Sequence, residues 1–388
     1  FFQTATRGTM ARPPEALVRQ GGMQNPFPNG DPGKRPWNRH PQFNAAGRNK
    51  LSMTVDLRKP KGKEIFNQLI EKSDIFIENN VPETIEKLGI TYEQLSKINP
   101  RLIMVRMPAY GLSGPYKNFR SFGTHLESTI GHTSVRGYTD TDPSLRGDVF
   151  TADAAAGALA AFAAIMALRH RNKTGKGQLV ELAQAEGFLP YLGQPIMEYT
   201  MNGRIPESWG NRHPFKAPHG CYPCKGENRW VVIAVGSDEE WLGLCQAMDN
   251  KALASDPRFG DSSNRYENQD ALDAIITQWT QDRDRYDIFH HLQKHGVPAG
   301  PVMDEADAYQ DPHMTERHFF HPLTHPEAGT HLYPGPTWRM SKTPNDLRLH
   351  PPLLGEHNEY VYKNILGISD AEYAQLEDEG HIGMDYAP

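Results

Sequence analysis

One acidic side chain stands directly before the most alanine-rich stretch of the chain. Asp153 lies between the segment 148–151, which reads as extended, and the run Ala154-Ala155-Ala156-Gly157. Asp is a preferred helix N-cap, because its oxygen accepts a backbone N–H that the first turn leaves unpaired, so position alone favours a capping role. A carboxylate kept ionised by a helix N-terminus can also attack an acyl carbon. The small residues that follow would admit a bulky thioester, although alanine is also the best helix former.

The spacing Cys221-Tyr222-Pro223-Cys224 is that of half a zinc site or of a redox pair. A structural zinc site needs a second pair, and only Cys245 remains, although His213 and His219 lie nearby. We therefore interpret the segment as the lead-in to a strand and expect no metal. An odd number of cysteines is not a disulfide framework, which favours a reducing, cytoplasmic location.

Other motifs exclude common classes of nucleotide and metal enzymes. The segment Lys173-Thr174-Gly175-Lys176-Gly177 lacks the full phosphate-loop pattern and follows a helix, whereas a phosphate loop precedes one. Neither GxGxxG nor HExxH occurs in the chain. The sequence thus carries no fingerprint of a dinucleotide-dependent oxidoreductase or of a zinc protease.

Composition indicates a folded protein without an extended basic surface. Of the 388 residues, 38% are hydrophobic and 23% are charged, which suffices for a core. The net charge is −6 and no dense Lys/Arg block occurs, so we expect neither a nucleic-acid nor an anionic-membrane partner. The apolar stretch 152–168 reads as too short and too alanine-rich to cross a bilayer.

The first third of the chain predicts an α/β fold. Prolines argue against regular elements in the first fifty residues. Strands are then expected at 52–57, 74–78 and 102–105, with a helix at 62–72 and another that Thr91 and Gln94 would cap and Asn99-Pro100 would end. Alternating strands and helices at this spacing give right-handed crossovers and a parallel sheet.

The rest of the chain predicts a second, smaller unit and a return to the first. The longest apolar helix is expected at 153–171, and from about residue 211 the composition shifts toward Pro, Gly and His. We expect domains at 1–210, 211–322 and 323–388. Further expected elements are strands at 178–182, 229–235, 296–302 and 330–340, and helices at about 183–201, after Ser237, at 270–281, at 285–295 and after Ser369.

Several short segments occur in an order that resembles the class III (CaiB/BaiF-type) CoA-transferases. This family includes formyl-CoA transferase and carnitine CoA-transferase, with α-methylacyl-CoA racemase as a relative. The ordered set spans roughly residues 44 to 388. The segments are 49–57, 74–79, 88–90, 99–103, Tyr110-Gly111-Leu112-Ser113-Gly114-Pro115-Tyr116, 153–157, 171–178, Gly296-Val297-Pro298-Ala299-Gly300-Pro301-Val302, 311–313 and 352–357.

The resemblance implies a covalent mechanism and a set of CoA contacts. The family's nucleophile, an Asp in a DxxxG setting, falls on Asp153 with Gly157, and Gly157 joins the CoA-binding residues. An aspartyl anhydride and then an aspartyl-CoA thioester would carry CoA from an acyl-CoA donor to a carboxylic acid acceptor. The family's CoA-contacting Asn matches Asn79, and its basic contacts fall on Arg58 and Lys87.

The resemblance also implies an architecture. A large Rossmann-like domain would be formed by both chain ends and a small α+β domain by the middle. Two chains would interlock as a homodimer with the active site between them. No tightly bound cofactor is implied, because the CoA thioester is a substrate.

Three departures from the family pattern keep alternatives open. The family's opening strand and loop would precede residue 1, the pair after Asn79 is Asn80-Val81 where the family has Phe-Arg, and Phe122-Gly123 stands where an aromatic-acid pair is expected. The racemase branch uses a His near Phe122, and here His125 lies three residues on, which disfavours a racemase or isomerase. The chain lacks the glycine run of formyl-CoA transferase, so formate or oxalate is not supported. A non-catalytic CoA-binding protein and a zinc module are the remaining alternatives.

Overall fold

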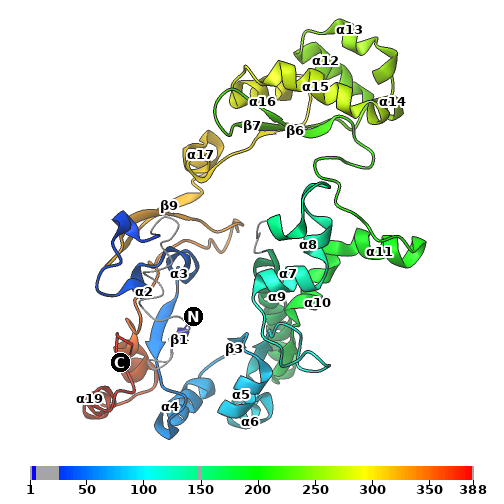
Figure 1. The fold of residues 1–388 in the computed structure, drawn as a ribbon. Helices are drawn as coiled ribbons and strands as arrows, with labels where there is room; N and C mark the ends of the chain where they lie inside the picture. Colours follow the sequence, from blue (N-terminus) through cyan, green and yellow to red (C-terminus); the bar gives the residue numbers. More distant parts are fainter. Residues whose placement is uncertain (1, 6–25, 147–150, 387–388) are drawn as a thin grey trace. The chain divides into compact units, whose positions relative to one another are not determined.

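The chain forms two compact units in this computed structural model, which describes residues 2–5, 26–146 and 151–386 (Figure 1). The first unit comprises residues 1–120, 156–184 and 309–388, and the second comprises 121–155 and 185–308. Within the second unit, the Ser208 hydroxyl donates to the Gly137 carbonyl and the Asn211 amide donates to the Tyr138 hydroxyl at 3.3 Å.

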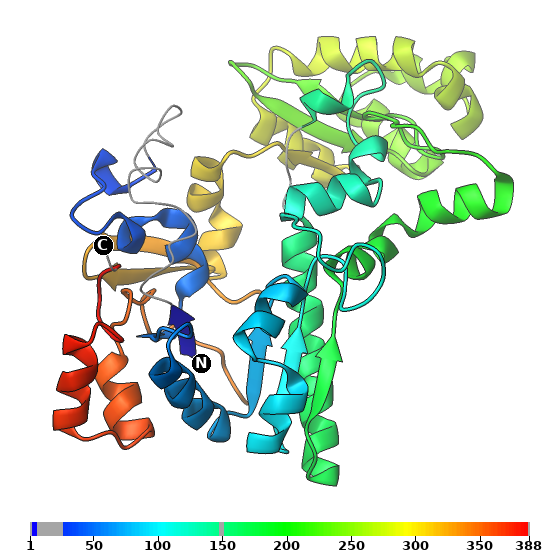
Figure 2. The same ribbon diagram turned by 60° about the horizontal axis from the view of Figure 1, so that its bottom comes forward.

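A parallel sheet lies at the centre of the first unit, which confirms the predicted α/β fold. Its strands run β3 (Ile75–Glu78), β4 (Ile103–Arg106) and β5 (Gln178–Glu181), and they lie side by side in that order (Figure 2). The strand β2 (Leu51–Thr54) pairs instead with β1 (Phe2–Ala5), also in parallel. The three strands predicted early in the chain therefore do not share one sheet.

Helix α4 (Pro60–Glu71) packs against both of these sheets. Its residues Ile65 and Leu69 join the core around β2, whereas Phe66 and Ile70 join the core under β3 and β4. The two rows follow from the 3.6-residue period, which places neighbours in sequence on adjacent stripes of the helix. Helices α5 (Pro82–Leu88) and α6 (Tyr92–Ile98) cover the same side of β4 as Phe66.

The other face of β4 is covered by the long helix α9 (Thr151–Thr174). Its small residues Ala160, Ala164 and Ala167 pack against Ile103 and Val105. Ala side chains let the helix approach the sheet closely, and alternation along β4 turns Ile103 and Val105 to this face. The stretch 152–168 was expected to be too short and too alanine-rich to cross a bilayer, but α9 is, among the described residues, the one helix that is long and apolar enough to do so by length and composition.

The C-terminal segment completes the first unit. An antiparallel hairpin of β9 (Phe320–His325) and β10 (Gly329–Pro334) precedes a π-helical segment, η6 (Tyr360–Ile365), and helix α19 (Asp370–Asp378). Ser369 caps α19 by accepting from the Glu372 N–H, as predicted. Asn358 accepts from the Thr54 N–H at 2.7 Å, which ties this segment to β2.

Local expectations failed at three places. The first fifty residues were expected to be irregular, yet α2 (Pro36–Arg39) and α3 (Pro41–Gly47) each begin with a proline, which suits the first helical position because the missing N–H has no partner there. Thr91 precedes α6 without a side-chain capping bond. The helix expected at 183–201 is split into α10 (Gln184–Phe188), a 3-10 turn around Pro190 and α11 (Gly193–Asn202).

The second unit is built on an antiparallel sheet of β6 (His219–Pro223), β7 (Trp230–Ala234) and β8 (Ala299–Pro301). Helices α12 (Asp238–Ala247), α15 (Gln269–Thr280) and α16 (Arg285–Lys294) pack on it around Leu244, Leu272 and Leu292. Ser237 caps α12 as predicted. Shorter helices of this unit are α7 (Gly123–Thr129), α8 (His132–Val135), α13 (Lys251–Ala254) and α14 (Ser262–Glu267). The chain returns to the first unit within α17 (Glu305–Gln310), and α18 (Pro312–Glu316) belongs to that first unit.

Candidate active site

Asp153 is the third residue of α9, so it is not the N-cap that its position in the sequence suggested. The helix begins earlier than expected, at Thr151. The side chain of Asp153 rests against Gly123, the first residue of α7, where an added Cβ would lie 2.4 Å from Oδ2 of Asp153. The carboxylate therefore occupies space that any side chain at position 123 would fill.

The capping role belongs to Glu127, which sequence reasoning missed. Its Oε1 accepts from the backbone N–H groups of Thr151 at 2.6 Å and Ala152 at 3.2 Å. These are the first N–H groups of α9, which have no partner within the helix. Glu127 is buried, with 1% of its surface exposed, and it comes from α7, the helix that also carries Gly123.

The His132 ring and the Arg136 guanidinium lie near the other oxygen of Glu127. Its Oε2 is 3.4 Å from Nδ1 of His132 and 3.5 Å from Nη1 of Arg136. The ring of Phe188 meets His132 edge-on at 5.2 Å between centroids. A buried carboxylate is costly unless it is paired and hydrogen-bonded, and this arrangement supplies both.

The surroundings make Asp153 a more basic carboxylate than usual. Burial raises the pKa of Asp153, and the charge of Glu127 raises that pKa further. A more basic carboxylate is a stronger nucleophile once it is ionised, and the group retains exposed surface. Asp153 therefore combines exposed surface with raised basicity.

Gly157 lies one helical turn beyond Asp153 on the same face of α9. A Cβ added to Gly157 would meet no heavy atom within 4 Å. This face of the helix is therefore open next to the carboxylate. The open face agrees with the interpretation that Gly157 leaves room for a bulky substrate.

All four predicted CoA contacts, Gly157 included, belong to the first unit, whereas Asp153 belongs to the second, with α9 running from one unit into the other. Asn79 is exposed directly after β3, and Arg58 lies beyond the end of β2. Arg58 forms a two-point ion pair with Asp56 at 2.9 and 2.8 Å, which lowers the pKa of Asp56 to about 2. Lys87, in the last turn of α5, pairs with Glu83. Both cations are exposed enough to meet a phosphate, but each already has an acidic partner.

The neighbourhood of Phe122 is occupied by local contacts. Nδ1 of His125 accepts from the Phe122 N–H at 3.1 Å, and the Phe122 side chain is 73% exposed. An acidic residue was expected at position 123, where Gly123 stands. The acidic residue of α7 is instead Glu127, one turn beyond Gly123. Gly123 and Glu127 are four residues apart, so they share one face of α7.

The cysteines lie in the second unit as free thiols. Burial raises the pKa of the Cys221 thiol and raises that of Cys224 to about 11. Both groups are therefore protonated near neutral pH, which disfavours the redox interpretation. Within residues 2–5, 26–146 and 151–386, no cluster of three His, Cys, Asp or Glu side chains could hold a metal.

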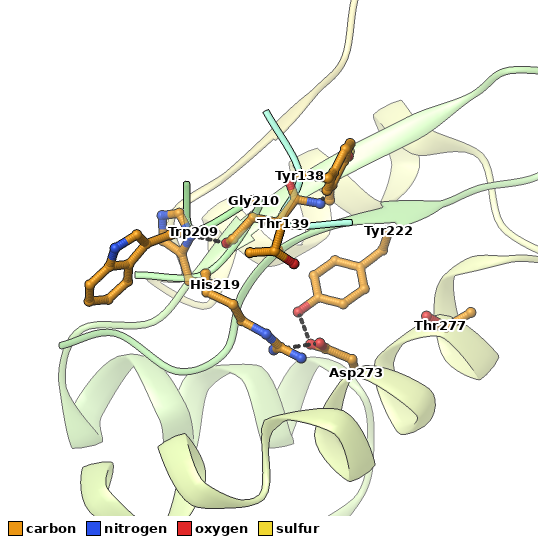
Figure 3. Close-up of a pocket in the computed structure, with 12 residues that line it drawn as sticks. Tyr138, Thr139, Trp209, Gly210, His219, Tyr222, Asp273 and Thr277 are labelled. Carbon is orange, nitrogen blue, oxygen red and sulfur yellow. Dashed lines mark hydrogen bonds and ion pairs between the residues drawn. The ribbon is translucent and has the colours of Figure 1, made fainter. Parts of the chain in front are cut away.

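A separate cavity of about 290 Å³ lies in the second unit beside β6 (Figure 3). The buried Tyr222 hydroxyl donates to Asp273 at 2.7 Å, and Arg212 pairs with the same carboxylate at 2.6 Å. Nδ1 of His219 lies 2.7 Å from the Asn211 carbonyl oxygen. The charged groups at this cavity thus satisfy one another.

Comparison with known proteins places the chain in one family. Residues 25–358 match the family described as CoA-transferase family III. The succinyl-CoA–D-citramalate CoA-transferase of Chloroflexus aurantiacus is 34% identical over 90% of this chain and 87% of its own length. The beta subunit of succinyl-CoA–L-malate CoA-transferase from the same organism is 33% identical over 86% of this chain and 82% of its own.

A solved structure supports the same assignment. The crystal structure of a CaiB/BaiF family protein from Brucella suis covers 84% of each chain with a TM-score of 0.76 at 30% sequence identity. The resemblance predicted from ordered motifs is thereby confirmed. The chain belongs to CoA-transferase family III and is a CoA-transferase.

Proposed function

We propose that the chain moves CoA from an acyl-CoA donor to a carboxylic acid through covalent intermediates on Asp153. The Asp153 carboxylate attacks the donor carbonyl, the carbon–sulfur bond breaks, and CoA leaves as a thiolate. The thiolate then attacks the aspartyl carbonyl of the mixed anhydride, which releases the donor acid and leaves an aspartyl-CoA thioester. The acceptor carboxylate repeats both exchanges in reverse, giving a new acyl-CoA and free Asp153.

The observation that carries this proposal is the setting of Asp153. The carboxylate is held against Gly123, its pKa is raised by burial and by Glu127, and the helix face beside it is open at Gly157. A carboxylate that served only as a helix cap would have its oxygens on the first N–H groups of α9, where Glu127 stands instead.

Trapping the intermediate tests the proposal. Incubation with an acyl-CoA and hydroxylamine should convert an aspartyl thioester into a hydroxamate, which peptide mass spectrometry should place on Asp153. We expect Asp153→Asn to lower kcat by roughly a thousand-fold or more. Asp261→Asn, which alters the N-cap of α14 in the same unit, is the matched control and should keep full activity. Full activity in Asp153→Asn would refute the proposal, and solvent deuterium at the α-carbon without an acceptor would indicate a racemase.

The relatives suggest which acids to test first. Both Chloroflexus relatives are named for succinyl-CoA and a hydroxy dicarboxylic acid. We propose succinyl-CoA as donor and a four- or five-carbon hydroxy dicarboxylate as acceptor. A matrix of donors and acceptors, with malate, citramalate and oxalate among the acids, should show its highest kcat/KM for such a pair.

Binding of the CoA phosphates is proposed for Arg58 and Lys87, with Asn79 nearby in the chain. Arg58 is exposed beyond the end of β2, where open α/β sheets bind ligands, and Lys87 is exposed in the last turn of α5, the helix that follows β3. We expect Arg58→Gln and Lys87→Gln to raise KM for acyl-CoA by roughly ten-fold with little change in kcat, because the contact is equal in ground and transition states. Lys72→Gln, an exposed change at the end of α4, should leave KM unchanged.

A homodimer of interlocked chains, each with a Rossmann-like large domain, is also proposed. Apolar side chains are exposed on two helices: Phe162 and Ile165 on α9, and Tyr199 and Met201 on α11. Phe162 and Ile165 are three residues apart on α9, and neighbouring exposed apolar side chains on one helix favour a partner chain. We place the enzyme in the cytoplasm, a proposal supported by its three free cysteines.

A further inference from the structure

We infer that Glu127 is a positioning residue for Asp153: from α7 it fixes the first turn of α9 and so keeps the Asp153 carboxylate seated on Gly123. This inference rests on the proposed role of Asp153 as the nucleophile. It goes beyond that role, because it assigns the orientation of the nucleophile to a second acidic residue that touches no substrate.

The geometry joins the two contacts through one helix face. Gly123 and Glu127 are separated by one turn of α7, so both face α9. Gly123 makes room for the Asp153 side chain, and Glu127 accepts from the N–H groups of Thr151 and Ala152. The backbone just before Asp153 and its carboxylate are therefore both held by α7. A displacement of α9 by a fraction of an ångström would move the Asp153 carboxylate out of contact with Gly123.

Glu127 also occupies backbone N–H groups that would otherwise be able to donate to Asp153. Two of the first N–H groups of α9 are taken by Glu127. If Asp153 accepted those bonds itself, its ionised form would be stabilised and its basicity would fall. The charge of Glu127 acts in the same direction, because it raises the pKa of Asp153.

The charged groups around this pair come from three elements. Glu127 belongs to α7 and Asp153 to α9, while His132 of α8 and Arg136 after α8 face Oε2 of Glu127. The remaining titratable group on α7, His125, accepts from the Phe122 N–H. The guanidinium of Arg136 lies 3.5 Å from Oε2 of Glu127, so the buried Glu127 carboxylate has a cationic partner besides its backbone N–H donors.

Two substitutions separate the charge of Glu127 from its capping bond. Glu127→Gln keeps an acceptor oxygen for the N–H groups but removes the charge. We expect the acid limb of the kcat/KM profile to shift to lower pH, because that limb reports ionisation of Asp153 in the free enzyme. Glu127→Ala removes the cap as well. Its kcat should fall by about 100-fold with little change in KM for acyl-CoA, as expected for a misplaced reacting group.

Asp284→Asn is the matched control. Asp284 caps α16 in the same unit by accepting from two backbone N–H groups, those of Tyr286 and Asp287. Its substitution should change neither the acid limb nor kcat. A merely structural role for Glu127 predicts the same result for Glu127→Gln as for Asp284→Asn.

The outcomes distinguish this inference from the proposed function. If hydroxylamine modifies Asp153 in the wild-type enzyme, and folded Glu127→Gln and Glu127→Ala keep the wild-type acid limb and kcat, the positioning role is refuted and the nucleophile stands. If Asp153 is never modified, both proposals fall. A shifted acid limb in Glu127→Gln, together with modification of Asp153, supports both.

Discussion

Gly123 has no side chain at the point where the Asp153 carboxylate lies, and this leads to a direct test. A methyl group at position 123 would lie 2.4 Å from Oδ2 of Asp153, closer than real contacts allow. We therefore expect Gly123→Ala to displace the carboxylate and to lower kcat by about 100-fold. Steady-state kinetics, with circular dichroism to confirm folding, measures the effect.

Gly193→Ala is the control for this prediction. Gly193 begins α11 in the same unit, and a Cβ there would meet nothing within 4 Å. Replacing it should stabilise the helix by about 0.5–1 kcal/mol without changing kcat. Wild-type activity in Gly123→Ala would show that catalysis does not require the Asp153 carboxylate to lie against residue 123.

The sequence alone pointed to Asp153 as the candidate nucleophile, but it did not point to Glu127, which binds the start of the same helix. Asp153 and Gly157 form a local pattern, because they lie four positions apart in one helix. Glu127 lies 24 residues before Thr151, and no periodicity links the two segments. Its role depends on how α7 packs against the start of α9, which is a tertiary contact. The one signal in the sequence is the four-residue spacing of Gly123 and Glu127, which places both on the same face of α7.

At the scale of elements, the β9–β10 hairpin should give the protein an acid-sensitive stability. His325 is buried, and its Nδ1 accepts from the N–H groups of Glu327 and Ala328. Burial, with nearby positive groups, lowers the pKa of His325 from 6.5 to about 4. The folded state therefore binds this proton less readily than the unfolded state does. Stability from this group is full above pH 6.5 and is lost as the pH falls toward 4.

Urea unfolding at neutral pH and at pH near 4 measures this effect. The free energy of unfolding should fall by up to about 3 kcal/mol over this interval because of His325. His325→Asn keeps an acceptor oxygen but cannot titrate, so it should lose less stability on acidification than the wild type. His313→Asn, an exposed change, should behave as wild type. Equal acid sensitivity in all three proteins would contradict the prediction.

Elements with a clear period were predicted well, and elements set by distant contacts were not. The helix expected at 62–72 occurs as Pro60–Glu71, because its two apolar rows are visible in the sequence. The strands expected at 74–78 and 102–105 occur as β3 and β4, but only β4 is buried along its whole length, and Ile77 of β3 is exposed. The sequence could not show that β2 pairs with β1, because pairing depends on which strand lies beside it. The prolines were read as breakers, although Pro36 and Pro41 begin helices.

For the whole molecule, the exposed apolar residues of α9 lead to a prediction about assembly. We expect the purified protein to have the mass of two chains by light scattering after size exclusion. Phe162, with 65% of its surface exposed, should lie in the interface, so Phe162→Glu should shift the mass toward one chain. Leu242→Glu, on exposed surface of α12, should leave the mass unchanged. A single-chain mass for the wild type at all concentrations would rule the dimer out.

The three thiols have a practical consequence for measuring turnover. Cys224 and Cys245 are buried with pKa values near 11, and burial also raises the pKa of Cys221. Aromatic disulfide reagents release a coloured product when they react with thiolates. The native enzyme should therefore react slowly with such a reagent at neutral pH. Free CoA would react at once. The absorbance of the coloured product should therefore report the release of free CoA as it occurs, because the thiols of the enzyme contribute almost no signal.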